Sequence, residues 1–277
     1  MLMKRLFLLA AVAGSLTLSF ADTSAPSPQQ KWKLIWKDEF NGRKLDSKKW
    51  EVLTREQSKH NELQYYTPDE VYLENGCLRL RSRQRDFGPQ HYTSGRVSTD
   101  GKFAPTYGRF EIRARLPGGQ GIWPAHWLYP QKRDWAMEYV MAEAVADGKE
   151  RLIPEFRPWY TEIDIMEFLG HERDVLYATF HFYSFDGKKR TSSGKLQKGV
   201  DYTADFHTYV LEWEVDEMRW YVDDQLIHST REGIPHAPHY LILNTAIGGA
   251  WPGNPDATTQ FPQYHDIDYV RVYQRAK

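Results

Sequence analysis

The stretch Gly108-Arg-Phe-Glu-Ile-Arg-Ala-Arg-Leu116 alternates apolar and charged side chains along its whole length. Every second residue from Phe110 to Leu116 is apolar, and the residues between them are charged. Successive side chains of a β-strand point to opposite faces of the sheet, so this pattern gives the strand one apolar face and one charged face. The stretch therefore predicts an antiparallel strand that covers a hydrophobic core on one side and meets water on the other.

Further segments of this kind recur along the chain. Residues 71–74 and 77–82 flank Asn75-Gly76, a dipeptide typical of a two-residue hairpin turn. Residues 209–215, 218–222 and 226–228 are expected to form a meander, and residues 267–273 alternate again near the C-terminus. Many short strands separated by turns predict an all-β sandwich.

Length and composition narrow the class of protein. The chain has 277 residues, which suits one large all-β domain with a sizeable core. The formal net charge is −1, so the sequence lacks the basic excess typical of proteins that bind nucleic acid or anionic membranes. The single cysteine, Cys77, excludes an intrachain disulfide framework. Aromatic residues make up 14% of the chain, and their places in the fold, in the core or in a binding site, bear on the function.

The first 21 residues have the layout of a secretory signal peptide. Lys4 and Arg5 precede an apolar run over residues 6–18, and Ser19-Phe20-Ala21 places small residues at the −3 and −1 positions of a cleavage site. The apolar run is short for a membrane span, which disfavours the alternative of an uncleaved anchor. We therefore expect a secreted or periplasmic protein with no membrane span after cleavage.

Behind the signal peptide, residues 22–31 are expected to form a flexible polar leader, and residues 32–277 a single domain. One segment of that domain departs from the strand pattern. Asp134 can cap a helix, apolar residues then follow at helical spacing, and Gly148 suits the end of the helix. We expect one helical loop insertion that decorates the sandwich.

Three carboxylates fall within the six residues Glu162-Ile-Asp-Ile-Met-Glu167. In a regular strand Glu162 and Asp164 share a face, whereas Glu167 points to the other one. A β-bulge absorbs one residue and returns Glu167 to the face of the other two. Crowded like charges cost free energy, and retaining glycoside hydrolysis uses such a group, with one carboxylate as nucleophile and one carboxyl as acid. From spacing alone, a solvated acidic face and a calcium site remain alternatives.

These six residues resemble the active-site signature of glycoside hydrolase family 16, in the bulged form of laminarinases. Further motifs that resemble the family follow in the family's order over residues 32–274: Asp38-Glu-Phe-Asn-Gly42, Asn61-Glu-Leu-Gln-Tyr-Tyr66, Tyr92-Thr-Ser-Gly-Arg96, Tyr107 to Pro117, Gly121-Ile-Trp-Pro-Ala-His-Trp127, Asn244 to Gly253, and Asp268-Tyr-Val-Arg-Val-Tyr273. The resemblance implies a concanavalin-type β-jelly-roll sandwich with a concave glycan-binding cleft.

The resemblance also implies roles for individual residues. Glu162 would be the nucleophile, Asp164 the supporting carboxylate, and Glu167 the general acid and later the general base. The substrate-binding candidates are the residues whose apolar rings or polar groups suit sugar faces and hydroxyls, namely Trp123, Trp127, Trp251, Asn61, Arg96, Asn244 and His181. Core packing is the structural alternative for each tryptophan, and a satisfied structural role is the alternative for His181.

No cofactor is required for this chemistry, although the resemblance implies a structural calcium ion on the convex face. The matching positions are the backbone carbonyls of Glu39 and Gly76 and the carboxylate of Asp268. No sequence motif enforces that site, because backbone ligands leave no signature in a sequence. The expected partner is a polysaccharide or glycan, with no nucleic acid, and the protein is expected to be a monomer.

An endo-β-1,3(4)-glucanase of the laminarinase kind is the leading functional hypothesis. Two departures bear on the substrate: the segment between Trp127 and Glu162 is longer than in laminarinases, and Arg157-Pro-Trp-Tyr-Thr161 replaces their Trp-Pro-x-x-Gly run. The alternative is therefore an endo-β-galactosidase that acts on mucin-type O-glycans or poly-N-acetyllactosamine. A non-catalytic lectin is disfavoured by the intact acids, and a calcium-binding sandwich domain leaves the tryptophan motifs unexplained.

Overall fold

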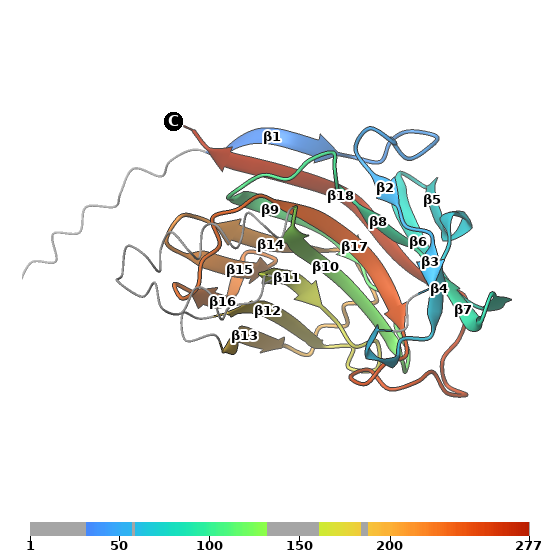
Figure 1. Cartoon of the computed structure of the whole chain (residues 1–277). Coiled ribbons are helices and arrows are strands. Elements are labelled where there is room, and N and C mark those ends of the chain that lie inside the picture. Colours follow the sequence, from blue (N-terminus) through green and yellow to red (C-terminus); the bar gives the residue numbers. More distant parts are fainter. Residues whose placement is uncertain (1–31, 57–58, 132–160, 184–187, 277) are drawn as a thin grey trace, which may run out of the picture. The chain divides into compact units, whose positions relative to one another are not determined.

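The computed structural model describes residues 32–56, 59–131, 161–183 and 188–276 (Figure 1). The predicted signal peptide, the predicted leader and the helix predicted within residues 134–148 lie outside these residues, so they stay predictions. Among the described residues there is no helix that is long and apolar enough to cross a membrane.

The described part of the chain consists of strands and two short 3₁₀ helices. In chain order these are β1 (Trp32–Asp38), β2 (Glu51–Val52), β3 (Arg55–Glu56), η1 (Lys59–Asn61), β4 (Gln64–Tyr66), η2 (Pro68–Glu70), β5 (Val71–Glu74), β6 (Cys77–Phe87), β7 (Gln90–Ser94), β8 (Arg96–Ser98), β9 (Gly108–Arg115), β10 (Ile122–Pro130), β11 (Glu162–Glu167), β12 (Val175–Tyr183), β13 (Lys189–Gln197), β14 (His207–Trp213), β15 (Met218–Val222), β16 (Gln225–Thr230), β17 (His239–Ile247) and β18 (Gln263–Arg275).

The strands form two sheets that pack against each other (Figure 1). The larger sheet has the order β16-β15-β14-β9-β18-β6-β7-β4-β3, with β1 paired to β18 and β5 paired to β6. The smaller sheet has the order β13-β12-β11-β10-β17-β8-β2. Neighbouring strands are antiparallel apart from β4 and β7. The prediction of an all-β sandwich is confirmed.

The core lies between the two sheets, and the alternation in the sequence explains it. Along β9, buried and half-buried side chains alternate over all its residues, and Phe110 and Ile112 are fully buried. Ile163 and Met166 face them from the smaller sheet as part of the same cluster. At roughly 1.5–3 kcal/mol for each fully buried large apolar side chain, this interlayer cluster is the main source of stability.

The turns connect these strands as their sequences predict. Asn75 and Gly76 have φ values of 53° and 76°, and they join β5 to β6 through the pair Glu74–Cys77. Positive φ at both central positions is what a type I′ hairpin requires, and Asn-Gly tolerates it well. The meander of β14, β15 and β16 is confirmed.

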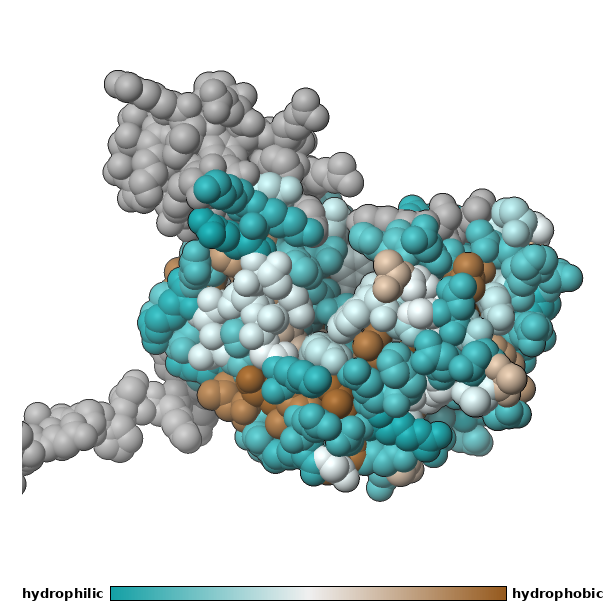
Figure 2. Space-filling view, turned by 90° about the horizontal axis from the view of Figure 1, so that it is seen from below, coloured by the Kyte–Doolittle hydropathy of each residue, from teal (hydrophilic) through white to brown (hydrophobic). Residues whose placement is uncertain are grey.

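The surface view in Figure 2 is mostly hydrophilic, with apolar residues in limited groups. Among the described residues the exposed large apolar side chains are Leu34, Ile35, Phe87, Val200, Val215, Leu226 and Trp251. Some of the aromatic residues lie in the core, among them Trp50, Trp213 and Trp220, and others line the cleft described next. Trp251 is exposed and also bears on that site.

Candidate active site

Strand β11 carries the three carboxylates, and its pairing contains the bulge that the spacing predicts. On the β10 side, His126 pairs with Met166 and Trp127 pairs with Asp164, so Ile165 has no residue opposite it. On the β12 side the register shifts over the same interval, between Asp164 and Glu167. The extra residue turns Glu167 back to the face that carries Glu162 and Asp164, which is the usual effect of a bulge.

The two neighbouring strands hold this face between them. Glu162 lies opposite His181 on β12, and Glu167 lies opposite Tyr177 on β12 and Ala125 on β10. The other face of β11 is apolar, because Ile163 and Met166 are buried in the core. The strand is thus anchored by its hydrophobic side, and its acidic side is presented to a cleft.

Asp164 is the most deeply buried of the three acids, with 5% of its surface exposed. Burial raises the pKa of its carboxyl well above the usual value, and the neighbouring charges of Glu167 and Glu162 add to the rise. Its backbone carbonyl accepts a hydrogen bond of 3.0 Å from the indole Nε1 of Trp220, on β15 of the other sheet. Asp164 therefore binds a proton more readily than an exposed aspartate does, and its main chain is held by the other sheet.

Glu167 lies in an environment suited to a general acid. Burial, followed by the charge of Glu162, raises the pKa of its carboxyl to about 7. Hydrogen bonds from Trp123 and Thr179 act in the opposite direction, and the Trp123 indole Nε1 donates to Oε1 at 3.2 Å. A carboxyl with a pKa near the working pH can both give and take a proton.

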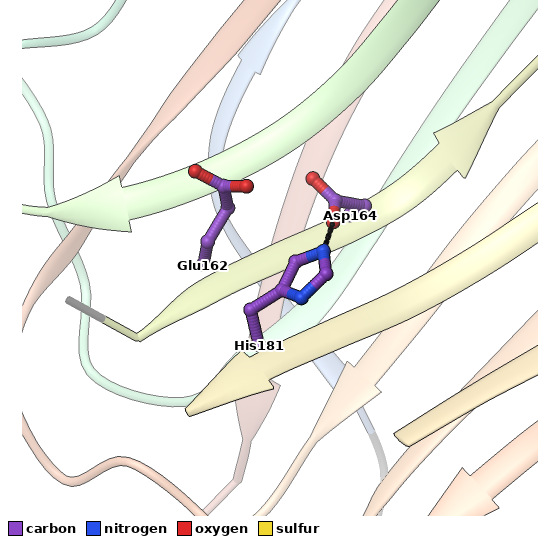
Figure 3. A group of neighbouring side chains, drawn as sticks. All are labelled: Glu162, Asp164 and His181. Carbon is purple, nitrogen blue, oxygen red and sulfur yellow. Dashed lines mark ion pairs between the residues drawn. The ribbon is translucent and has the colours of Figure 1, made fainter. Parts of the chain in front are cut away.

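His181 projects from β12 toward the acids (Figure 3). Its Nε2 lies 3.6 Å from Oδ2 of Asp164, and its Nδ1 shares a 3.0 Å hydrogen bond with Oγ1 of Thr191. Burial, with a contribution from the Lys189 charge, lowers the pKa of the His181 imidazole to about 4. His181 is therefore neutral at pH 7, and it adds no positive charge to the acid cluster.

The cleft around the acids is lined by aromatic and polar side chains from five strands and the segment before β4: His60, Glu62, Tyr66, Arg96, Trp123, Ala125, Trp127, Glu162, Asp164, Glu167, Asn244 and Ala246. Five of the seven predicted substrate-binding residues therefore contact this cleft or its acids: Trp123, Trp127, Arg96, Asn244 and His181. The remaining two, Asn61 and Trp251, do not line it.

Trp127 and Asn244 are bonded to each other. The Trp127 indole Nε1 donates to Oδ1 of Asn244 at 2.7 Å, and Nδ2 of Asn244 donates to the hydroxyl of Tyr66 at 3.1 Å. The guanidinium of Arg96 stacks on the rings of Trp127, at 5.1 Å, and Tyr66, at 5.9 Å. This network fixes the orientation of the Trp127 ring in the cleft wall.

Trp251 and Asn61 take positions that the sequence does not specify. Trp251 is 41% exposed, and its ring meets Trp123 at 5.4 Å and Tyr177 at 4.9 Å, both edge to face. It extends the aromatic wall of the cleft beyond Trp123. Asn61 has a φ of 63° and is exposed, and it does not line the cleft, whereas His60 and Glu62 do.

Glu62 and Tyr66 are site residues that sequence reasoning did not select. Glu62 is buried, with 9% of its surface exposed, and it accepts a 2.7 Å hydrogen bond from Gln64. Both residues belong to the motif that starts at Asn61. The alternation of Glu62, Gln64 and Tyr66 along one face was the signal available for finding them.

The three positions of the predicted calcium site lie near one corner of the larger sheet. Asp38, next to Glu39, pairs with Val270, and Ile267 pairs with Leu78, two residues from Gly76. The side chains of this corner already have cationic partners: Glu39 binds Arg271 at 2.8 Å, and Asp268 binds Arg113 at 2.5 Å. The fit is incomplete, since one carboxylate oxygen of Asp268 is engaged, and the calcium ion stays a prediction.

Two family models match the chain. The model of the family described as "Glycosyl hydrolases family 16" matches residues 151–271. The model described as "Beta-glucan synthesis-associated protein SKN1/KRE6/Sbg1" matches residues 15–131. A beta-glucanase of Rhodothermus marinus is 36% identical over 99% of this chain and 95% of its own length.

Solved structures are also similar to this chain, in both sequence and fold. The catalytic domain of an endo-1,3-beta-glucanase (laminarinase) from Thermotoga petrophila has 37% sequence identity and a TM-score of 0.72, over 90% of this chain and 100% of its own. A structure from work on endo-acting O-glycanases of the human gut microbiota has 31% identity and a TM-score of 0.75, over 90% and 92% of the two chains.

Proposed function

This chain belongs to glycoside hydrolase family 16, and on that premise we propose that it is an endo-β-1,3(4)-glucanase that cleaves internal bonds of laminarin-like glucans with retention of configuration. One observation carries the proposal. Three carboxylates lie on one face of the bulged strand β11, and burial raises the pKa of Glu167 to about 7. That arrangement supplies an acid and a nucleophile on one cleft wall, as double displacement needs.

In the first step, a carboxylate oxygen of Glu162 attacks the anomeric carbon and forms the glycosyl–enzyme bond. Glu167 gives its proton to the glycosidic oxygen as the bond to the leaving sugar breaks. In the second step, Glu167 takes a proton from water, and the resulting hydroxide equivalent displaces Glu162 from the anomeric carbon. Two inversions at one carbon give net retention.

We assign Asp164 a supporting role in both steps. Burial and the charges of Glu167 and Glu162 raise the pKa of its carboxyl, so uptake of a proton by Asp164 relieves the repulsion among the three acids. Two ionised neighbours in a buried site would repel each other and favour uptake of a proton. A protonated Asp164 leaves one negative charge for Glu162 while Glu167 holds its proton.

The cleft walls suit a neutral glycan. The Trp123 and Trp127 rings present flat surfaces that match the C–H faces of pyranose rings, while Arg96 and Asn244 present donors and acceptors for hydroxyls. A polymeric glucan does not cross a membrane, which agrees with the proposed export of the chain by its N-terminal segment. We extend the proposal to an extracytoplasmic enzyme that acts as a monomer.

Product mapping on laminarin, lichenan, agarose, porphyran and mucin O-glycans tests the function. We expect oligosaccharides from laminarin and lichenan, with the β-anomer formed first in the NMR spectrum of the fresh digest. The O-glycanase structure has a TM-score of 0.75, so the galactosidase alternative has a fold match of similar quality. Cleavage of mucin glycans without cleavage of laminarin would replace the glucanase proposal with that alternative, and early α-anomer would contradict double displacement.

A further inference from the structure

We propose that Glu162, Asp164 and His181 form a binding site for Zn²⁺, and that the bound ion excludes the glycan from the cleft. Each residue offers one ligand atom, and these atoms lie within 4.8 Å of one another. The ring of His181 points from β12 toward Asp164, and Glu162 lies beside them on β11 (Figure 3). Binding of the ion does not depend on the identity of the glycan; only its competition with substrate rests on the proposed function.

An unsatisfied oxygen points to a ligand at this place. Oδ2 of Asp164 is buried and has no hydrogen-bond partner among the described residues. Nε2 of His181 lies 3.6 Å from this oxygen, which is longer than a hydrogen bond. A buried carboxylate oxygen without a partner is costly, and a cation between it and the imidazole would satisfy both atoms.

His181 is already arranged as a metal ligand. Its Nδ1 is held by Oγ1 of Thr191 at 3.0 Å, which leaves Nε2 directed at Asp164. Metal-binding histidines are usually oriented in this way, by a hydrogen bond to the ring nitrogen that does not bind the metal. The imidazole is neutral at pH 7, which is the form that coordinates a metal.

The donor set selects the ion. One imidazole nitrogen and two carboxylate oxygens suit Zn²⁺, which binds three protein ligands and leaves a fourth position open, whereas Ca²⁺ and Mg²⁺ prefer oxygen ligands alone. With bonds of about 2.0–2.2 Å, the ligands of tetrahedral zinc lie about 3.4 Å apart. The Asp164–His181 separation of 3.6 Å meets this spacing, and the ligand atom of Glu162, which lies within 4.8 Å of the other two, would have to move closer on binding.

One charge opposes the ion. Lys189, on β13, lies near enough to lower the pKa of both Asp164 and His181. Zinc binding requires both carboxyls to be ionised, so the ion must displace any proton held by Asp164. The bound ion would then meet one cation and two carboxylates, and its net environment would be anionic. Because the ion would bind the proposed nucleophile Glu162, zinc and glycan cannot occupy the cleft together.

Calorimetric titration of Zn²⁺ into the full chain, without a polyhistidine tag, tests the site directly. We expect one ion per chain, and we expect His181→Ala to weaken binding at least tenfold. Thr191→Val removes the hydrogen bond that orients the imidazole and should weaken binding about 10–100-fold, as loss of such outer partners does. The control is His91→Ala, because His91 forms an exposed pair with Asp86 at 2.7 Å and lies outside the cleft.

Inhibition kinetics with laminarin complete the test, and we expect zinc to raise KM with kcat unchanged. The proposal is overturned if no ion binds, if the affinity of His181→Ala equals that of His91→Ala, or if zinc lowers kcat alone. Far-ultraviolet circular dichroism of each variant identifies any that fail to fold. If His181→Ala does not fold, the zinc affinity of Thr191→Val is compared with that of His91→Ala instead. Calorimetry needs no substrate, so a wrong glucanase assignment would leave the binding result intact.

Discussion

Asp164 and Asp266 are both aspartates with side chains that are almost wholly buried, yet their pKa values move in opposite directions. Asp266, on β18 of the larger sheet, is 2% exposed and binds Arg79 at 2.6 Å and Arg115 at 2.7 Å. Burial would raise its pKa, but these two guanidiniums lower it overall. Asp164 has carboxylates and a neutral histidine around it, and its pKa rises.

The same contrast extends to the two sheets. On the larger sheet, Glu70 is fully buried and is met by the guanidiniums of Arg81 and Arg83 at 2.6 and 2.7 Å. On the smaller sheet the buried acids are held by their strand and by indole and hydroxyl donors. A buried carboxylate with a matched cation serves stability, whereas a buried carboxylate among other acids keeps a proton for chemistry.

The largest expected effect is on turnover at the unmatched acids. Glu162→Gln should lower kcat by about 10⁴-fold or more, because it removes the nucleophile, while the midpoint of thermal unfolding stays within a few degrees. Reducing-sugar release from laminarin and a thermal melt measure both quantities. Asp266→Asn is the control, and its kcat per folded molecule should equal that of the wild type. Near-normal turnover by Glu162→Gln would show that the nucleophile is assigned wrongly.

The second effect is on stability at the matched acid. Asp266→Asn leaves Arg79 and Arg115 without their shared carboxylate, and we expect a loss of about 3 kcal/mol in the free energy of unfolding at pH 7. Because the folded pKa of Asp266 is lowered, this loss should shrink as the pH falls below about 4. Urea denaturation at several pH values measures it. Asp86→Asn, in an exposed pair with His91, should change the free energy by less than about 1 kcal/mol.

The third effect has the opposite sign. The folded pKa of Glu167 is raised from 4.5 to about 7, so the folded state holds a proton more tightly and loses stability as pH rises through that window. Glu167→Gln should therefore be more stable than the wild type at pH 8, on the order of 1 kcal/mol, while being nearly inactive. Denaturant melts at pH 4 and pH 8 measure the difference. A variant that is less stable at both pH values would contradict the raised pKa.

The smallest effect is a shift in the pH profile. Trp123→Phe keeps an aromatic ring in the cleft but removes the indole hydrogen bond that lowers the pKa of Glu167. The alkaline limb of kcat/KM, expected near pH 7, should move upward by some tenths of a pH unit. Trp127→Phe is the matched control, since its indole binds Asn244 instead, and its limb should not move. An unchanged limb in Trp123→Phe would show that the hydrogen bond does not tune Glu167.

Local sequence patterns predict much of this fold because side-chain alternation and turn residues act over a few positions. The alternation from Phe110 to Leu116, the Asn75-Gly76 turn and the bulge between Asp164 and Glu167 all follow from counting residues. Acids at positions 162, 164 and 167 can share one face of β11 only if the strand contains one extra residue, so their spacing alone predicts the bulge.

The parts of the site that sequence reasoning did not reach depend on long-range packing. His60 and Asn61 both adopt positive φ values, and Glu62 lines the cleft whereas Asn61 does not. Asn244 binds the Trp127 indole, a contact between residues 117 positions apart. Neither the backbone conformation nor the partner is visible in a local pattern. The same holds for the matched cations of Asp266, which come from two different strands.

The hydrogen bond from Trp220 to the main chain of Asp164 has a consequence for how this protein can change over time. The indole belongs to β15 of the larger sheet, yet it donates a hydrogen bond to the backbone of Asp164, where the bulge of β11 begins. Main-chain acceptors cannot be mutated away, so the only inherited variable in this contact is the tryptophan. The two sheets are therefore coupled in evolution. We expect a substitution of Trp220 to shift the backbone of Asp164, and with it the spacing of the three acids, although none of the acids is itself replaced.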